Sequence, residues 1–149
     1  FDLIKYILTN KTTFELTTLI ENISALFPAC SVTNSLAIEC QVEADKNQLE
    51  QVLINLFKNA FEAMVKNEEK IIEINCLQEA KWLQISIVDH GTGIANSDNL
   101  FVPFYTTKKQ GSGIGLALCR QIMFNHNGLI KVKNAEQHSG VEVILSLPK

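Results

Sequence analysis

The chain lacks the features that mark membrane-spanning and nucleic-acid-binding proteins. Its 149 residues contain no run of about 20 apolar residues that could cross a bilayer, and no recognisable signal peptide. The formal net charge is −3, with lysines and glutamates interspersed, so no basic stripe indicates nucleic acid or a lipid surface. We therefore expect no nucleic-acid partner and no direct membrane contact.

Metal-ligand spacing is also missing. The cysteines are Cys30, Cys40, Cys76 and Cys119, and the histidines are His90, His126 and His138. No two cysteines form a CxxC pair, and none stands at ligand spacing from a histidine. We expect the cysteines to be small, buried and reduced side chains, and we expect no metal site built on histidine.

What the chain does contain is enough apolar material for one core. Hydrophobic residues make up 46% of the sequence and charged residues 19%, which is typical of a globular domain. Because the first residue is Phe1 and not methionine, we expect a piece of a longer protein. Residues 1–12 are predicted to be a linker or the tail of a preceding helix, and residues 13–149 a single domain.

Apolar periodicity predicts three helices, which span residues 13–27, 45–64 and 115–125. Thr13 is the expected cap of the first helix. Asp45 caps the second, with Gln48 three residues later as in a capping box, and the third stops at residues 127–128.

Short apolar or alternating runs predict the strands, at residues 31–43, 71–77, 82–88, 129–133 and 141–147. Neighbouring strands are mostly joined by hairpins. We therefore expect an α/β (α+β) two-layer sandwich, in which a mixed β-sheet is covered on one face by about three helices.

A glycine-rich run stands directly before the third helix. It comprises Gly111, Ser112, Gly113, Ile114, Gly115 and Leu116. Glycines at alternate positions let backbone amides close around an anion, and the helix that follows presents free N–H groups to the same place. The run indicates phosphate binding, although short glycine repeats also occur in ordinary loops.

The second helix carries a polar strip. Asn55 and Asn59 are four residues apart and share one face, which Lys58 and Glu62 extend. An asparagine offers a neutral carbonyl oxygen, which suits Mg²⁺ and does not repel phosphates. The alternative is a solvated helix face.

An aspartate ends the strand at 82–88. Asp89 is followed by His90, Gly91, Thr92, Gly93 and Ile94. A carboxylate at the end of a buried strand is costly unless it is paired, and the amino group of a nucleobase would be a suitable donor. The two glycines would allow the backbone to approach an aromatic ring. A plain strand-ending turn is the alternative.

An aromatic cluster lies in the long loop at residues 100–105. It either fills a minor core or fixes the loop over a ligand. Phe104 belongs to this cluster, and Thr107 and Lys108 follow it; Lys108 could meet a terminal phosphate.

In this order the motifs resemble the catalytic and ATP-binding domain of two-component sensor histidine kinases, over residues 13–148. Residues 49–64 resemble the N box, 89–93 the first glycine box, 101–104 the F box and 111–116 the second glycine box. The short lid at 94–110 and the run at 104–108 resemble the nitrogen-regulation subgroup. The resemblance implies the Bergerat ATP-binding fold.

The resemblance also implies roles for single residues, with ATP and Mg²⁺ as cofactors. Asn59 is the implied Mg²⁺ ligand, Asn55 lies beside the phosphates, and Asp89 accepts from the adenine amino group. Asn55, Asn59 and Lys108 are the implied catalytic residues. The other implied nucleotide contacts are Lys58, Gly91, Gly93, Ile94, Phe104, Thr107, Gly111, Ser112, Gly113, Ile114, Gly115 and Leu116. Val141 departs from the usual threonine, so a hydroxyl that would hold a water near adenine is missing.

The resemblance implies a histidine protein kinase. Related hydrolytic ATPases carry a glutamate base where this chain has Asn55, and an amide cannot take a proton from water. The implied phosphoacceptor lies on a dimerisation domain before Phe1, and a response regulator receiver domain acts indirectly. The domain is expected to face the cytosol and to be monomeric when isolated. The full protein is expected to be a homodimer, either anchored in the inner membrane or without an anchor. A hydrolytic ATPase and a non-catalytic nucleotide-binding module are the alternatives.

Overall fold

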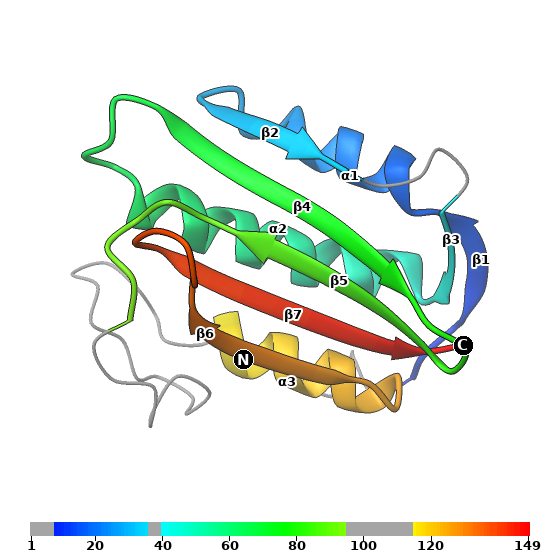
Figure 1. Cartoon of the computed structure of the whole chain (residues 1–149). Coiled ribbons are helices and arrows are strands. Elements are labelled where there is room, and N and C mark those ends of the chain that lie inside the picture. The colour runs from blue at the N-terminus through cyan, green and yellow to red at the C-terminus, as the bar shows by residue number, and fades with distance from the viewer. Residues whose placement is uncertain (1–7, 36–39, 95–114) are drawn as a thin grey trace.

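The structure is a computed structural model that describes residues 8–35, 40–94 and 115–149 (Figure 1). In chain order the elements are β1 (Thr12–Glu15), α1 (Leu16–Ser24), β2 (Cys30–Asn34), β3 (Gln41–Ala44), α2 (Lys46–Ala63), β4 (Lys70–Gln78), β5 (Trp82–Val88), α3 (Gly115–Asn125), β6 (Leu129–Asn134) and β7 (Val141–Pro148). No helix in these ranges is both long and apolar enough to span a bilayer.

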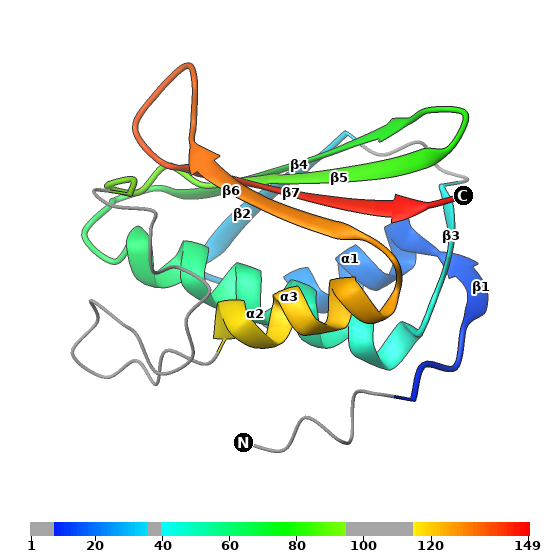
Figure 2. The ribbon, with the colours of Figure 1, turned by 90° about the horizontal axis from the view of Figure 1, so that it is seen from below.

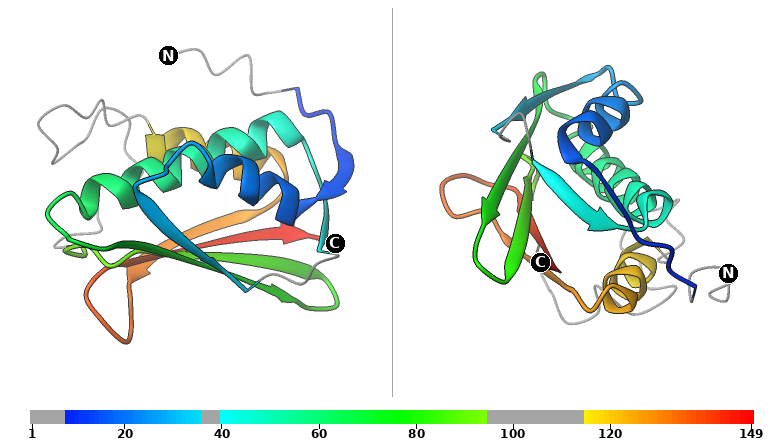
Figure 3. Two further views of the ribbon diagram at one scale, coloured as in Figure 1. Left: turned by 90° about the horizontal axis from the view of Figure 1, so that it is seen from above. Right: turned by 90° about the vertical axis from the view of Figure 1, so that its right-hand side faces the viewer.

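The main sheet has five strands in the order β2-β4-β5-β7-β6. The β2–β4 pair is parallel and the other three pairs are antiparallel, so the sheet is mixed. The three described helices all cover one face of it, and the small β1–β3 sheet lies at one end (Figures 2 and 3). The predicted two-layer sandwich is therefore confirmed.

The core lies between the sheet and the helices. In β4 one polar residue separates Ile72 from Ile74, and in β5 one polar residue separates Ile85 from Ile87. These four isoleucines are buried together with Phe57 of α2. Each such side chain contributes about 1.5–3 kcal/mol when it is fully buried. This packing fixes α2 against the sheet and so positions the polar residues on its other faces.

The start of α2 is tied to the end of α3. Asp45 accepts the Gln48 N–H at 3.1 Å, as the predicted cap requires. The return half of a capping box does not form, because the Asp45 N–H donates to His126 Nε2 at 2.9 Å. His126 Nδ1 lies 2.8 Å from the Ile122 carbonyl, which can only accept, so Nε2 keeps the lone pair that receives Asp45.

Two predictions about the first third of the chain were wrong. Thr13 does not cap a helix but lies in β1, and α1 begins after Glu15 without a side-chain cap. The stretch at 31–43, predicted as one strand, contains parts of two strands, of which β2 pairs with β4 and β3 pairs with β1. The β-branched threonines fit a strand, but their partner is distant in sequence and leaves no local signal.

The third helix ends at residues 127–128 as predicted, but an asparagine and not the glycine takes the left-handed conformation. Asn127 takes the left-handed conformation (φ 57°), and the N–H groups of Asn127 and Gly128 donate to the carbonyls of Phe124 and Met123. This is a Schellman motif built on asparagine, which tolerates that conformation better than other side chains.

We predict that His126→Ala lowers the free energy of unfolding by about 2–4 kcal/mol. The substitution leaves the Asp45 N–H unpaired, removes one of the two hydrogen bonds to the Ile122 carbonyl and removes a buried ring. Urea denaturation monitored by circular dichroism measures this. His138→Ala, in the β6–β7 connection and measured with a chelator present, is the matched control and should change stability by less than about 1 kcal/mol. Equal effects of the two substitutions would contradict the proposed tie between α2 and α3.

Candidate functional site

The predicted site residues that the structure describes come from α2, from the end of β5 and from the start of α3. Asn55 and Asn59 of α2 are half-buried, whereas Lys58 is exposed. The alternative of a fully solvated helix face therefore does not describe the two asparagines.

The side chain of Asn55 on α2 lies at the contact with α3. Gln51 Nε2 donates to its Oδ1 at 3.1 Å, and its Nδ2 lies 3.9 Å from Cys119 Sγ. Burial raises the pKa of the Cys119 thiol to about 12, so the protonated sulfur can donate to the Val52 carbonyl at 3.7 Å. Both ends of the Asn55 amide are thus oriented by neighbours.

Asp89 follows β5 and is 6% exposed. Its Oδ1 accepts the N–H of Gly91 at 2.9 Å and the N–H of Val141 at 3.1 Å. Within the described ranges no hydrogen bond reaches Oδ2. The Gly91 bond is that of an ordinary Asx turn, but the Val141 bond comes from a different strand and is not explained by a strand-ending turn.

The environment of Asp89 shifts its acidity. Burial raises the pKa of this carboxyl above its ordinary value, while the two backbone amides and the nearby His90 and His138 oppose the rise. A buried carboxyl with a raised pKa at a strand end is the kind of group found in ligand sites.

Close backbone approach fixes this corner of the molecule. A Cβ on Gly140, at φ 141°, would lie 2.0 Å from the Asp89 carbonyl oxygen. A Cβ on Gly91 would lie 2.7 Å from the Cβ and the carbonyl oxygen of Ala63 at the end of α2. Neither position can carry a side chain without moving the Asp89 turn.

Asn134 at the end of β6 and Ser139 in the β6–β7 connection complete the corner, and the sequence did not indicate them. Asn134 accepts the Ile94 N–H at 2.7 Å and donates to the Ile94 carbonyl at 3.1 Å. Ser139 Oγ donates to the Gly91 carbonyl at 2.9 Å. In the sequence these residues are typical of a turn, and only the sheet topology brings them to Asp89.

Two further predicted residues are described here. Gly93 has φ 85°, and Ile94 after it is held by Asn134. At Val141 the side chain has no hydroxyl, but the backbone N–H contacts the Asp89 carboxylate and the carbonyl accepts the Asp89 N–H at 3.0 Å.

Part of the predicted site lies outside the described residues. Those positions are Phe104, Thr107, Lys108, Gly111, Ser112, Gly113 and Ile114. Of the glycine-rich run, the structure describes Gly115, which opens α3, and Leu116, which packs against the core.

Contrary to the expectation of scattered histidines, two of the three are in contact. His90 and His138 stack with ring centroids 3.7 Å apart, and Glu73 lies 3.3 Å from His90 Nε2. The register of β4, β5 and β7 brings them together, because Glu73 and Glu142 both pair with Val88.

The cysteines also depart from the expectation in part. All four are free, but Cys30 and Cys76 are only half-buried. Cys40 and Cys76 are in contact, with their sulfurs 3.4 Å apart.

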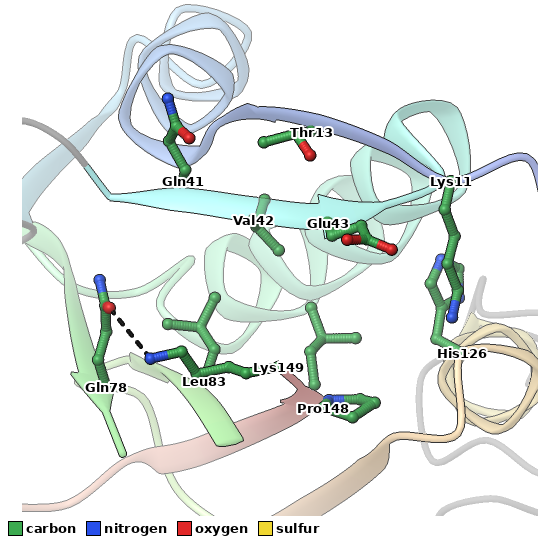
Figure 4. A pocket seen from close by; sticks show the side chains of 11 residues that line it. Lys11, Thr13, Gln41, Val42, Glu43, Gln78, Leu83, His126, Pro148 and Lys149 are labelled. Carbon is green, nitrogen blue, oxygen red and sulfur yellow. Dashed lines mark hydrogen bonds between the residues drawn. The ribbon is translucent and has the colours of Figure 1, made fainter. Parts of the chain in front are cut away.

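A separate pocket of about 360 Å³ lies at the other end of the main sheet. Its lining includes Val42 of β3, His126 after α3, and Pro148 and Lys149 at the end of β7 (Figure 4). Asp89 contacts the opposite end of β7, and eight strand residues span roughly 25 Å, so the pocket is not part of the Asp89 corner.

We predict that Asp89→Asn flattens part of the pH dependence of stability. Because burial raises the folded pKa above the ordinary 3.8, the folded state binds this proton more tightly, and stability falls as the pH rises from 3.8 through the raised value. An asparagine Oδ1 still accepts from Gly91 and Val141. Urea denaturation between about pH 4 and pH 7 should show the variant gaining on the wild type as the pH rises. A difference independent of pH would contradict the assignment.

Comparisons with known proteins identify the family of this chain. The sequence profile of the family described as "Histidine kinase-, DNA gyrase B-, and HSP90-like ATPase" matches residues 44–149. Sporulation kinase C of Bacillus subtilis (strain 168) is 32% identical over 146 residues, which cover 91% of this chain and 34% of that protein. The chain thus spans about a third of this relative.

Solved structures of similar proteins match the fold. The catalytic domain of histidine kinase ThkA is 34% identical with a TM-score of 0.82, covering 94% of this chain and 96% of that one. A crystal structure of ThkA in complex with the response regulator protein TrrA matches with 30% identity and a TM-score of 0.77, over 95% of this chain and 42% of that one. The nitrogen-regulation subgroup stays a prediction. The chain has the Bergerat fold of these domains and belongs to the histidine kinase-, DNA gyrase B- and HSP90-like ATPase family.

Proposed function

We propose that this chain is the ATP-binding catalytic domain of a sensor histidine kinase, which transfers the γ-phosphoryl group of ATP to a histidine on a separate domain. The observation that carries the proposal is the half-buried Asn55 amide, held between α2 and α3 by Gln51 and Cys119. An amide has no basic lone pair to activate water, whereas a neutral imidazole acceptor needs no activation of that kind.

Asp89 is the proposed contact to the base. Oδ1 is occupied by the amides of Gly91 and Val141, which leaves Oδ2 to accept from the exocyclic amino group of adenine. The fixed amides hold the carboxylate plane, so recognition requires no reorganisation of the aspartate. Family membership supports ATP as the ligand.

Asn59, with Asn55 one turn before it, is the proposed holder of Mg²⁺. The Asn59 side chain is half-buried and carries a neutral carbonyl oxygen, a hard ligand that fits this ion, and Asn55 is proposed to lie beside the phosphates. Bound Mg²⁺ supplies charge neutralisation on the phosphates. The residues of this chain position the nucleotide, and the glycine-rich run with Lys108 is proposed to surround the phosphates.

The proposed partners follow from the relatives. The acceptor histidine is placed on a dimerisation domain of the same protein, and a response regulator receiver domain would then take the phosphoryl group. The complex of ThkA with TrrA supports a response regulator as partner. We propose that the full protein is a homodimer and that this domain faces the cytosol.

Phosphoryl transfer is the direct test. The domain, mixed with the dimerisation domain of its own protein and γ-labelled ATP with Mg²⁺, should place label on histidine, while alone it should hydrolyse ATP much more slowly than about one turnover per second. Steady hydrolysis of several per second by the clean domain would favour the hydrolytic ATPase. ATP binding without any label on histidine would favour the non-catalytic module.

Matched asparagine variants sharpen this test. Asn59→Ala should abolish label transfer and Mg²⁺-dependent ATP binding in calorimetry, because it removes the proposed metal ligand. Asn75→Ala is the control, since Asn75 is exposed on β4, and it should change neither measurement. Unchanged ATP affinity in Asn59→Ala would show that the metal is held elsewhere.

A further inference from the structure

Three metal-ligating side chains meet on the face of the sheet that the helices do not cover. Glu73 comes from β4, His90 from the residues after β5, and His138 from the β6–β7 connection. On β4, Ile72 and Ile74 are buried toward the helices, so Glu73 between them points to the other face. One ligand atom from each of the three lies within 4.8 Å of the others.

We propose that Glu73, His90 and His138 form a binding site for a divalent transition-metal ion of the zinc class. Two imidazoles and one carboxylate are a donor set that zinc uses with an open fourth position for water. Imidazole nitrogens favour zinc and its neighbours over Mg²⁺, which prefers oxygen ligands. The site is separate from the proposed Mg²⁺ site on α2.

The distance between the first two ligands already suits a metal. His90 Nε2 lies 3.3 Å from Glu73 Oε1. Two zinc bonds of about 2.0–2.1 Å at a tetrahedral angle separate their ligand atoms by about 3.3 Å. His90 now donates a hydrogen from Nε2 to this carboxylate, so metal binding moves that hydrogen to Nδ1 and leaves the Nε2 lone pair for the ion. Their side chains are 28% and 40% exposed, so water can reach the open position.

The third ligand has the required tautomer. His138 Nδ1 lies 2.8 Å from the Ser139 carbonyl, which only accepts, so this nitrogen carries the hydrogen and Nε2 keeps its lone pair. Such a bond from the second ring nitrogen is the usual support of a metal-bound histidine. The rings of His90 and His138 are nearly parallel, at 13°, and must tilt apart for one ion to lie in both ring planes.

The backbones that carry the ligands are held independently of the ligands. Asn67 Nδ2 donates to the His90 carbonyl at 2.8 Å, and Ser139 Oγ donates to the Gly91 carbonyl at 2.9 Å. A metal ion would therefore join β4, the end of β5 and the β6–β7 connection at a place that is already ordered. The expected consequence is higher stability when the ion is bound.

Zinc titration of the metal-free chain tests the proposal. Calorimetry with Zn²⁺ should give one ion per chain with a dissociation constant of about 1 μM or lower, and Zn²⁺ should raise the Tm by about 5 °C or more. His138→Ala should weaken binding by about 100-fold and Glu73→Gln by about 10-fold or more. Both variants should melt like the wild type in a chelator, which shows that they are folded.

The contact between Cys40 and Cys76 provides the control, because thiolates also bind zinc. Cys76→Ser should leave the Zn²⁺ affinity unchanged, and Co²⁺ bound to the wild type should show no sulfur-to-metal charge-transfer band. The proposal is overturned if the wild type does not bind Zn²⁺, if His138→Ala binds it as well as the wild type, or if Cys76→Ser loses binding.

Discussion

The pair of hydrogen bonds accepted by Asp89 Oδ1 is the interaction on which the rest of the site depends. One donor is local, from Gly91, and the other, from Val141, belongs to the neighbouring strand. The second bond forms only because Gly140 carries no Cβ to collide with the Asp89 backbone. A buried carboxylate without these donors would cost several kcal/mol or become neutral. With them it becomes a fixed acceptor whose second oxygen is available to a ligand.

The same corner couples the two layers of the fold. Gly91 lies against the end of α2, so the turn that holds Asp89 also sets the position of the helix that carries Asn55 and Asn59. At the other end of α2, His126 ties its first turn to α3. Contacts thus hold the helix at both ends, and they join the proposed base contact to the proposed metal ligand, as positioning of a nucleotide for phosphoryl transfer requires.

Local sequence patterns predicted the parts of the fold that local chemistry decides. The α2 cap at Asp45, the β5 strand and the end of α3 are confirmed because capping, alternation and the stop at Asn127 act within a few residues. The predictions that were wrong concern pairing across the chain, as at Thr13, whose strand partner lies 30 residues away in β3.

The site shows the same division. Asp89 and the asparagines were indicated by residue type and spacing. Residue type and spacing did not indicate Asn134, Ser139 or the contact between His90 and His138. The pairing of β6 with β7 brings these residues to the site, and their own sequence resembles an ordinary turn. No pattern within a short window contains that information.

The central claim is that Asp89 recognises the amino group of adenine, and base selectivity tests it most directly. Inosine triphosphate has the same ribose and phosphates as ATP but carries a carbonyl oxygen in place of that amino group, which would face the Asp89 carboxylate without a hydrogen to share. Calorimetry with Mg²⁺ should show ATP binding about 100-fold or more tightly than inosine triphosphate. Affinities equal within about threefold would contradict the account.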